Sequence, residues 1–105
     1  MSGSWSTTIP SGVNAQPGIW KLTIDEGGVF LTHPQGNRFQ PGEVLDVSPT
    51  ELVLAPDPGC PGQGTPTEGR YQWRIEGDTL AFELVSDSCK DRADTLTSSD
   101  WSLTP

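Results

Sequence analysis

The side chains best suited to binding chemistry in this sequence are aromatic, and they recur at every second position. In the run from Gly69 to Cys89, Tyr71 and Trp73 alternate with charged and polar residues, and Phe82 follows a Gly77-Asp78 turn. Period-two alternation places such a set on one face of a pleated hairpin. That face offers flat apolar walls and a hydroxyl group, which suit a small hydrophobic ligand.

Similar alternation elsewhere in the chain extends this inward-facing set. The candidate ligand contacts are Trp20, Leu22, Leu31, Tyr71, Trp73, Phe82 and Trp101. Aromatic residues also fill small barrels, because each one buries a large apolar area. The sequence leaves both outcomes open, a lined cavity and a filled core.

Groups for acid–base or metal chemistry are sparse. His33 is the only histidine and has no evident paired nucleophile, which disfavours both triad chemistry and a typical zinc site. We expect it at the surface or the rim of the fold. Glu76 and Glu83 fall on the outward face of the hairpin, which disfavours a glycosidase-like carboxylate pair. We therefore predict no catalytic residue, no metal site and no cofactor.

Three aspartates, Asp87, Asp91 and Asp94, are spaced so that they could gather on one side of a turn. A calcium site needs about six to eight oxygens, and the ligand order of an EF-hand is absent. We expect capping and ion pairing with Lys90 and Arg92 instead.

Length and charge narrow the classes of function. The 105 residues predict one domain, 1–105. The net charge of -8, with six basic residues, disfavours a nucleic-acid or anionic-membrane surface and is compatible with a neutral or cationic small molecule. No stretch approaches the roughly 20 apolar residues of a transmembrane helix. The sequence does not indicate an oligomeric state.

Two cysteines, Cys60 and Cys89, predict a disulfide rather than a metal site or a reactive thiol pair, because the domain is small, lysine-poor and rich in Pro and Gly. A closed loop of roughly 30 residues stabilises a fold by about 3–4 kcal/mol. This favours an extracellular or cell-envelope protein. Met1 to Ser4 has neither the charged nor the apolar region of a signal peptide, so we expect an excised mature domain, with a cytoplasmic protein bearing free thiols as the alternative.

The alternation predicts eight short strands. They are Trp5 to Ile9, Trp20 to Asp25, Val29 to His33, Phe39 to Val47, Glu51 to Ala55, the two arms of the Gly69–Cys89 hairpin, and Trp101 to Thr104. Pro41-Gly42 breaks the fourth strand early, and Pro56 to Glu68 reads as a surface loop. A single helical turn is expected around Lys90 to Thr95.

These strands predict an all-β fold. Eight antiparallel up-and-down strands can close into a barrel that leaves no exposed edge. A two-sheet β-sandwich is the alternative. In the barrel, the ends of the fifth and seventh strands lie at one rim, where the disulfide would tie the Pro-rich loop.

Several segments resemble calycins, the lipocalin-like barrels, and in particular the small lipocalin-like domains common in actinobacteria. Gly3-Ser4-Trp5 is similar to the G-x-W signature of calycins, and the further matching segments are WSTTI, GIWKLTID, GRYQWRIEGDTL and DSCKDRADTL, followed by Trp101. The resemblance implies an antiparallel barrel, often exported, whose interior can hold a small apolar molecule. It also implies a basic side chain packed over the first-strand Trp5, for which Arg92 is the candidate. Because Arg92 precedes the last strand, an ion pair with Asp87 or Asp91 is the alternative.

Three functions follow as hypotheses. The first is a module that binds a small hydrophobic molecule inside the barrel. The second is a natural-product cyclase, a Diels–Alderase-like barrel that folds a polyene substrate without acid–base residues. The third is a structural or accessory domain of an exported protein.

Overall fold

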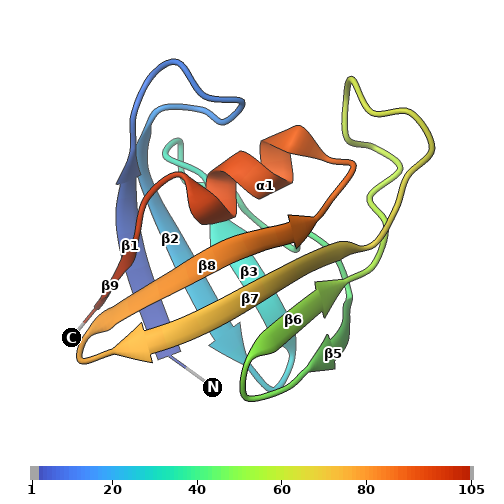
Figure 1. Cartoon of the computed structure of the whole chain (residues 1–105). Helices are drawn as coiled ribbons and strands as arrows, with labels where there is room; N and C mark the ends of the chain where they lie inside the picture. The colour runs from blue at the N-terminus through green and yellow to red at the C-terminus, as the bar shows by residue number, and fades with distance from the viewer. Residues whose placement is uncertain (1–2, 105) are drawn as a thin grey trace.

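The computed structural model describes residues 3–104 and shows an all-β protein with one short helix (Figure 1). Met1 and Ser2, on which part of the signal-peptide argument rests, lie outside the described residues. The elements are β1 (Gly3–Ile9), β2 (Gly18–Asp25), β3 (Gly28–Thr32), β4 (Arg38–Phe39), β5 (Val44–Val47), β6 (Glu51–Leu54), β7 (Gly69–Glu76), β8 (Thr79–Ser86), α1 (Lys90–Thr97) and β9 (Trp101–Leu103).

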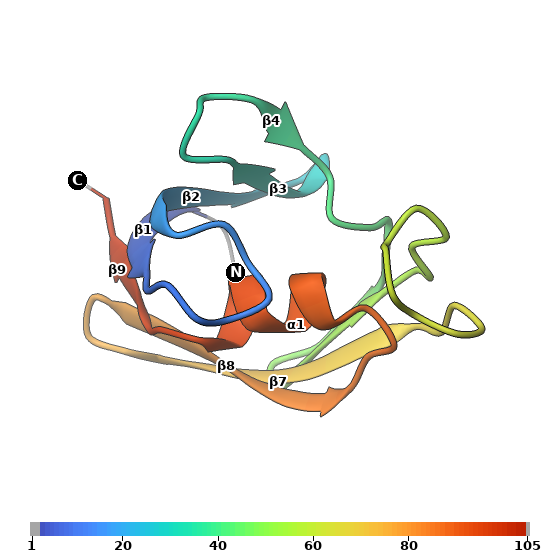
Figure 2. The same ribbon diagram turned by 90° about the horizontal axis from the view of Figure 1, so that it is seen from above.

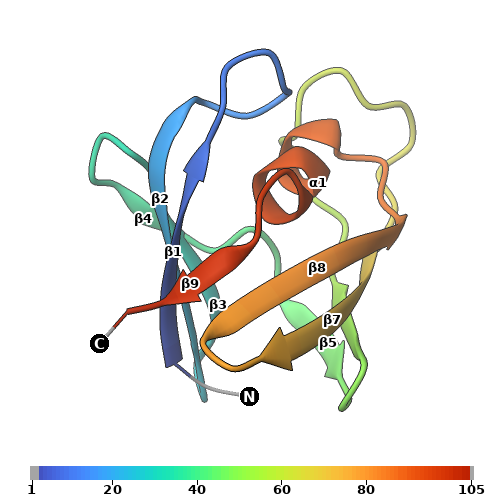
Figure 3. The same ribbon diagram turned by 60° about the vertical axis from the view of Figure 1, so that its left-hand side comes forward.

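The strands form one antiparallel sheet in the order β4-β3-β2-β1-β9-β8-β7-β6-β5. Strand β9 lies between β1 and β8 and joins the first half of the chain to the second (Figure 3). All other neighbouring strands in the sheet are also consecutive along the chain. The sheet is therefore a meander in which the first strand, β1, pairs with the last strand, β9. The hairpin of β7 and β8, within Gly69–Cys89, pairs as expected, with Trp73 opposite Phe82 and Gly77-Asp78 at its turn.

The expected eight-stranded barrel is not confirmed, and the sandwich alternative is wrong, because one sheet of nine strands is present. The difference arises at Pro41-Gly42. The predicted strand from Phe39 to Val47 is divided there into β4 and β5, which form the two outer edges of the sheet. Proline lacks the N–H that a ladder requires, so pairing stops on both sides of it. We call the region between these two edges the seam.

Side chains from both halves of the sheet fill its concave face. The buried cluster contains Trp5, Ile9, Trp20, Leu22, Ile24, Val29, Leu31, Leu52, Leu54, Tyr71, Leu80, Phe82, Ala93, Leu96 and Trp101. Alternation explains most of these residues, because β1, β2, β3, β6, β7 and β8 contribute side chains from alternate positions. This packing accounts for the burial of aliphatic and aromatic area that stabilises so small a domain.

The expected helical turn extends to a helix, α1, which lies between the β2–β3 side and the β7–β8 side when the molecule is seen from above (Figure 2). Cys89 is its N-cap residue, and its Sγ accepts a hydrogen bond from the Arg92 N–H at 3.3 Å. Ala93 and Leu96 are buried in the core, and the Trp101 Nε1–H donates to the Leu96 carbonyl at 3.1 Å. The helix therefore closes one end of the curved sheet.

The expected disulfide between Cys60 and Cys89 is present, with 29 residues of sequence separation. It joins the N-cap of α1 to the Pro-rich loop between β6 and β7. The loop and the helix end are thereby held together at the seam.

Candidate functional site

The predicted ligand contacts belong mainly to the packed interior. Trp20, Leu22, Leu31, Tyr71, Phe82 and Trp101 are all buried members of the core cluster. Trp73 is partly buried against the same cluster, and its Nε1–H donates to the Ser48 carbonyl at 3.1 Å. The structure brings six of these side chains together as a core, and only Trp20 and Leu31 also line the pocket described next.

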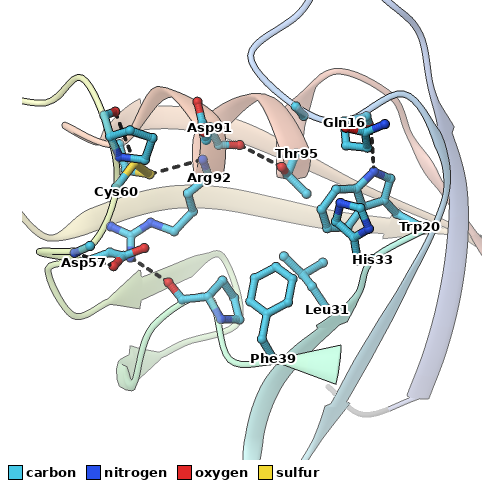
Figure 4. A pocket seen from close by; sticks show the side chains of 15 residues that line it. Gln16, Trp20, Leu31, His33, Phe39, Asp57, Cys60, Asp91, Arg92 and Thr95 are labelled. Atoms are coloured by element: carbon cyan, nitrogen blue, oxygen red, sulfur yellow. Dashed lines mark hydrogen bonds between the residues drawn. A yellow bond between two sulfur atoms is a disulfide. The ribbon is translucent and has the colours of Figure 1, made fainter. Parts of the chain in front are cut away.

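A half-open pocket of about 220 Å³ lies at the seam, under helix α1 (Figure 4). One wall comes from β2 to β4 and the segment that follows, and the opposite wall comes from the Pro-rich loop and α1. The lining residues are Ala15, Gln16, Trp20, Leu31, His33, Phe39, Pro41, Asp57, Gly59, Cys60, Pro61, Cys89, Asp91, Arg92 and Thr95. Most of these groups are apolar or aromatic, which is typical of small-molecule sites.

The aromatic wall has a defined geometry. Trp20 packs edge-to-face on His33, with ring centroids 5.0 Å apart, and on Phe39 at 6.2 Å. The Trp20 Nε1–H donates to the Gln16 carbonyl at 2.8 Å, which fixes the indole against the β1–β2 loop. His33 Nδ1 accepts the Gln35 N–H, and its rim position agrees with the expectation for a lone histidine. The wall is thus held in place by ring packing and by the hydrogen bond of Trp20.

The opposite wall is organised by a buried ion pair. The Arg92 guanidinium donates from Nε to Asp87 Oδ2 at 2.7 Å and from Nη2 to Asp87 Oδ1 at 2.9 Å. The Tyr71 hydroxyl donates to the same carboxylate, and the Cys89 N–H donates to Oδ1 at 2.9 Å. A two-point pair of this kind combines charge with fixed orientation.

The same guanidinium also reaches across the seam. Its Nη1 donates to the carbonyl of Pro41 at 3.0 Å, in the segment between β4 and β5, and to that of Ala55 at 2.8 Å, just after β6. Gly42 and Gly69 leave room for it, since an added Cβ at either residue would lie 2.8 Å from an Arg92 nitrogen. Arg92 therefore supplies hydrogen bonds where the strand ladder is interrupted.

The expected packing of Arg92 over Trp5 is wrong, and the ion-pair alternative with Asp87 is what the structure shows. A guanidinium buried in this region needs a carboxylate and carbonyl acceptors, which the indole face of Trp5 does not provide. Within residues 3–104, the cation–π contact is instead Arg38 over the Phe30 ring at 4.2 Å.

The network shifts the ionisation of its members. Burial tends to raise the pKa of Asp87, but the hydrogen bonds from Arg92 and Tyr71 outweigh it and hold that pKa below its usual value. Burial and then the hydrogen bond to Asp87 raise the pKa of Tyr71 well above the ordinary phenol value. Burial tends to lower the pKa of Arg92, but the contacts with Asp87 raise it overall. The pair is therefore ionised and the phenol neutral at physiological pH.

Two further carboxylates, Asp57 and Asp91, line the pocket. Asp57 Oδ1 accepts the Gly59 N–H at 3.1 Å in a turn of the Pro-rich loop, and Asp91 lies in the first turn of α1. The third aspartate of the expected group, Asp94, accepts the Asn14 N–H at 2.7 Å. Of the expected ion pairs, the structure shows the one between Asp87 and Arg92, and no pair with Lys90 is present within residues 3–104. The same residues contain no group of His, Cys, Asp or Glu that could hold a metal ion.

The outer face of the Gly69–Cys89 hairpin carries mixed charge. Arg70 pairs with Glu51 at 3.3 Å and with Glu68 at 3.0 Å, and Arg74 pairs with Glu76 at 3.4 Å. Exposed pairs of this kind contribute little to stability. Glu83 is also exposed, so the outward placement of the two hairpin glutamates is confirmed.

Sequence reasoning missed Phe39, Pro41 and Asp57 as pocket residues. Phe39 could have been found, because it pairs with Leu31 across β3 and β4 and shares its inward face. Nothing local marks Pro41 or Asp57, which reach the pocket only because the divided strand and the tethered loop meet at the seam.

Comparison of the chain with known protein families, with curated proteins and with solved structures found no match. Among residues 3–104, no helix has the length and apolar character needed to cross a membrane.

Proposed function

We propose that this chain is a lipocalin-like binding module whose ligand is a small hydrophobic molecule held in the seam pocket. The observation that carries the proposal is the pocket itself, with an aromatic wall of Trp20, His33 and Phe39 positioned by β2 to β4. The packed interior argues against the ligand position expected from the sequence. The seam provides the opening that the filled core does not.

The volume supports a ligand of one or two rings. A cavity of about 150 Å³ is enough to hold benzene, and the seam pocket measures about 220 Å³. Pockets for drug-sized ligands begin at about 300 Å³. A folded polyene, which the cyclase hypothesis requires, needs more room than this pocket has, so we favour the binder over the cyclase.

The disulfide supports an extracellular or cell-envelope location, because such bonds persist in oxidising compartments. A pocket walled by both cysteines would also keep its shape there. The lipocalin-like assignment rests on the segments quoted above and on the meander of antiparallel strands, with β9 joining the two halves.

Titration with 2-phenylethanol, followed by protein NMR, tests the proposal. We expect saturable changes in the chemical shifts of residues that line the seam pocket. Phe39→Ala, which removes an exposed part of the aromatic wall, should weaken binding by about tenfold through lost apolar contact.

Phe30→Ala is the matched control, because Phe30 neighbours the wall on β3 but does not line the pocket. Its affinity should equal that of the unaltered protein. An absence of saturable binding, or equal losses in the two variants, would overturn the proposed function in favour of the structural or accessory role.

A further inference from the structure

We propose that the ligand of the seam pocket is a cation, namely a small aromatic or apolar amine. This inference rests on the proposed function and names the chemical class of its ligand. Three features of the pocket support it: the contacts that already occupy the Arg92 guanidinium, the carboxylate of Asp57, and the aromatic wall.

Arg92 does not make the pocket an anion site, although it is the one arginine or lysine among the lining residues. Four of its N–H groups already donate, two to Asp87 and one each to Pro41 and Ala55. Its charge is balanced by the bidentate carboxylate, and its side chain is 2 % exposed. An anionic ligand would have to compete with a carboxylate that is already in place.

Asp57 supplies a carboxylate that no basic side chain neutralises within residues 3–104. Its Oδ1 accepts one backbone hydrogen bond from Gly59. A carboxylate is an acceptor with about four lone-pair sites, so Asp57 retains capacity for a donor from a ligand. An ammonium group can supply that donor and offset the charge.

The aromatic wall faces Asp57 and Arg92 across the pocket (Figure 4). Trp20 and Phe39 can contact the apolar body of a ligand, and aromatic rings attract a cation near their faces. Asp91 adds a second negative charge at the pocket, and the whole chain carries -8. The field of the protein therefore favours a cation over an anion of the same shape.

Three probes that share a phenylethyl body separate charge from shape: 2-phenylethylamine, 2-phenylethanol and 3-phenylpropionate. Each is titrated at pH 7 and low ionic strength, with shifts of the pocket residues as the readout. We expect the amine to bind about tenfold more tightly than the alcohol, and the acid to bind more weakly than both. Added salt should weaken the binding of the amine and leave the binding of the alcohol unchanged.

Asp57→Asn keeps the size of the side chain and an acceptor for the Gly59 N–H while removing the charge. It should reduce the preference for the amine over the alcohol to threefold or less. Asp46→Asn, on the exposed edge strand β5 and outside this pocket, is the matched control and should retain the preference.

The two proposals fail in different ways. If the alcohol binds at the pocket but the acid binds as well as the amine, the cation inference is overturned and the binding function stands. The same holds if Asp57→Asn keeps the full preference for the amine. If none of the three probes binds, the proposed function fails, and the ligand class fails with it.

Discussion

Arg92 and Asp87 form a bidentate ion pair that is withdrawn from solvent, with side chains 2 % and 0 % exposed. The pair lies where the divided strand leaves the sheet without a ladder, and its arginine also holds the carbonyls of Pro41 and Ala55. One side chain of α1 thus connects the helix, the β4–β5 segment and the end of β6. We infer that this contact holds the two sides of the seam together and stabilises the pocket beside it.

Arg92→Met should destabilise the protein by about 3–5 kcal/mol, because it leaves the Asp87 carboxylate buried without its counter-charge. Chemical unfolding with the disulfide intact measures the change. Arg70→Met is the control: it removes an exposed arginine with two carboxylate partners and should cost less than about 1 kcal/mol. Equal losses of stability in the two variants would contradict this structural role of Arg92.

Stability should fall in acid because of Asp87. Its pKa is lowered in the folded state, so its contribution is fully present above the ordinary aspartate value of about 3.9 and is lost as the pH falls through the folded value below it. The free energy of unfolding should therefore decline below about pH 4. In Asp87→Asn this decline should be shallower. An unchanged slope in that variant would assign the acid sensitivity to other carboxylates.

Gly69→Ala should destabilise the fold, because the added methyl group has no room beside the ion pair. A Cβ there would lie 2.8 Å from both Arg92 Nη2 and Asp87 Oδ2, so the ion pair must shift. We expect a loss of about 1–3 kcal/mol, the usual range for overpacking. Gly64→Ala, where nothing lies within 4 Å, should change thermal stability little. A Gly69→Ala variant as stable as Gly64→Ala would show that the pair can move freely.

Removing the disulfide should cost about 3–4 kcal/mol, the value for a loop of roughly this length. Two double variants separate the covalent bond from the helix cap: Cys60→Ala/Cys89→Ala and Cys60→Ala/Cys89→Ser. The serine restores an N-cap acceptor for the Arg92 N–H, so that variant should be more stable by about 1 kcal/mol. Urea unfolding measures both, and identical values would deny the capping role of residue 89.

Trp73→Phe should lower stability and leave binding at the seam unchanged. The indole donates to the Ser48 carbonyl and packs on the core, and it does not line the seam pocket. We expect a loss of about 1–2 kcal/mol, from the missing hydrogen bond and the smaller ring. Affinity for 2-phenylethanol should stay within twofold, as titration of the variant can check. A selective loss of affinity would indicate that Trp73 contacts the ligand.

Most of the strands could be predicted because the alternation of inward and outward residues is local. The Gly69–Cys89 hairpin, its two-residue turn and the strands around Trp20 and Trp101 lie where the pattern indicates. The disulfide was also predictable, because the chain is small, lysine-poor, rich in Pro and Gly and contains two cysteines. The aromatic residues were correctly expected to face inward, with Trp73 only partly buried.

The sequence by itself determined the all-β class and the hairpins, because neighbouring residues and short turns decide them. It also determined the pairing of Cys60 with Cys89, because the chain has two cysteines. Only the tertiary structure decided that the sheet stays open between β4 and β5, and that Arg92 lies on Asp87 rather than over Trp5. Both outcomes depend on acceptors from distant segments, such as the carbonyls of Pro41 and Ala55, which meet Arg92 only after folding. A buried charge takes its position from the partners that the whole fold brings to it.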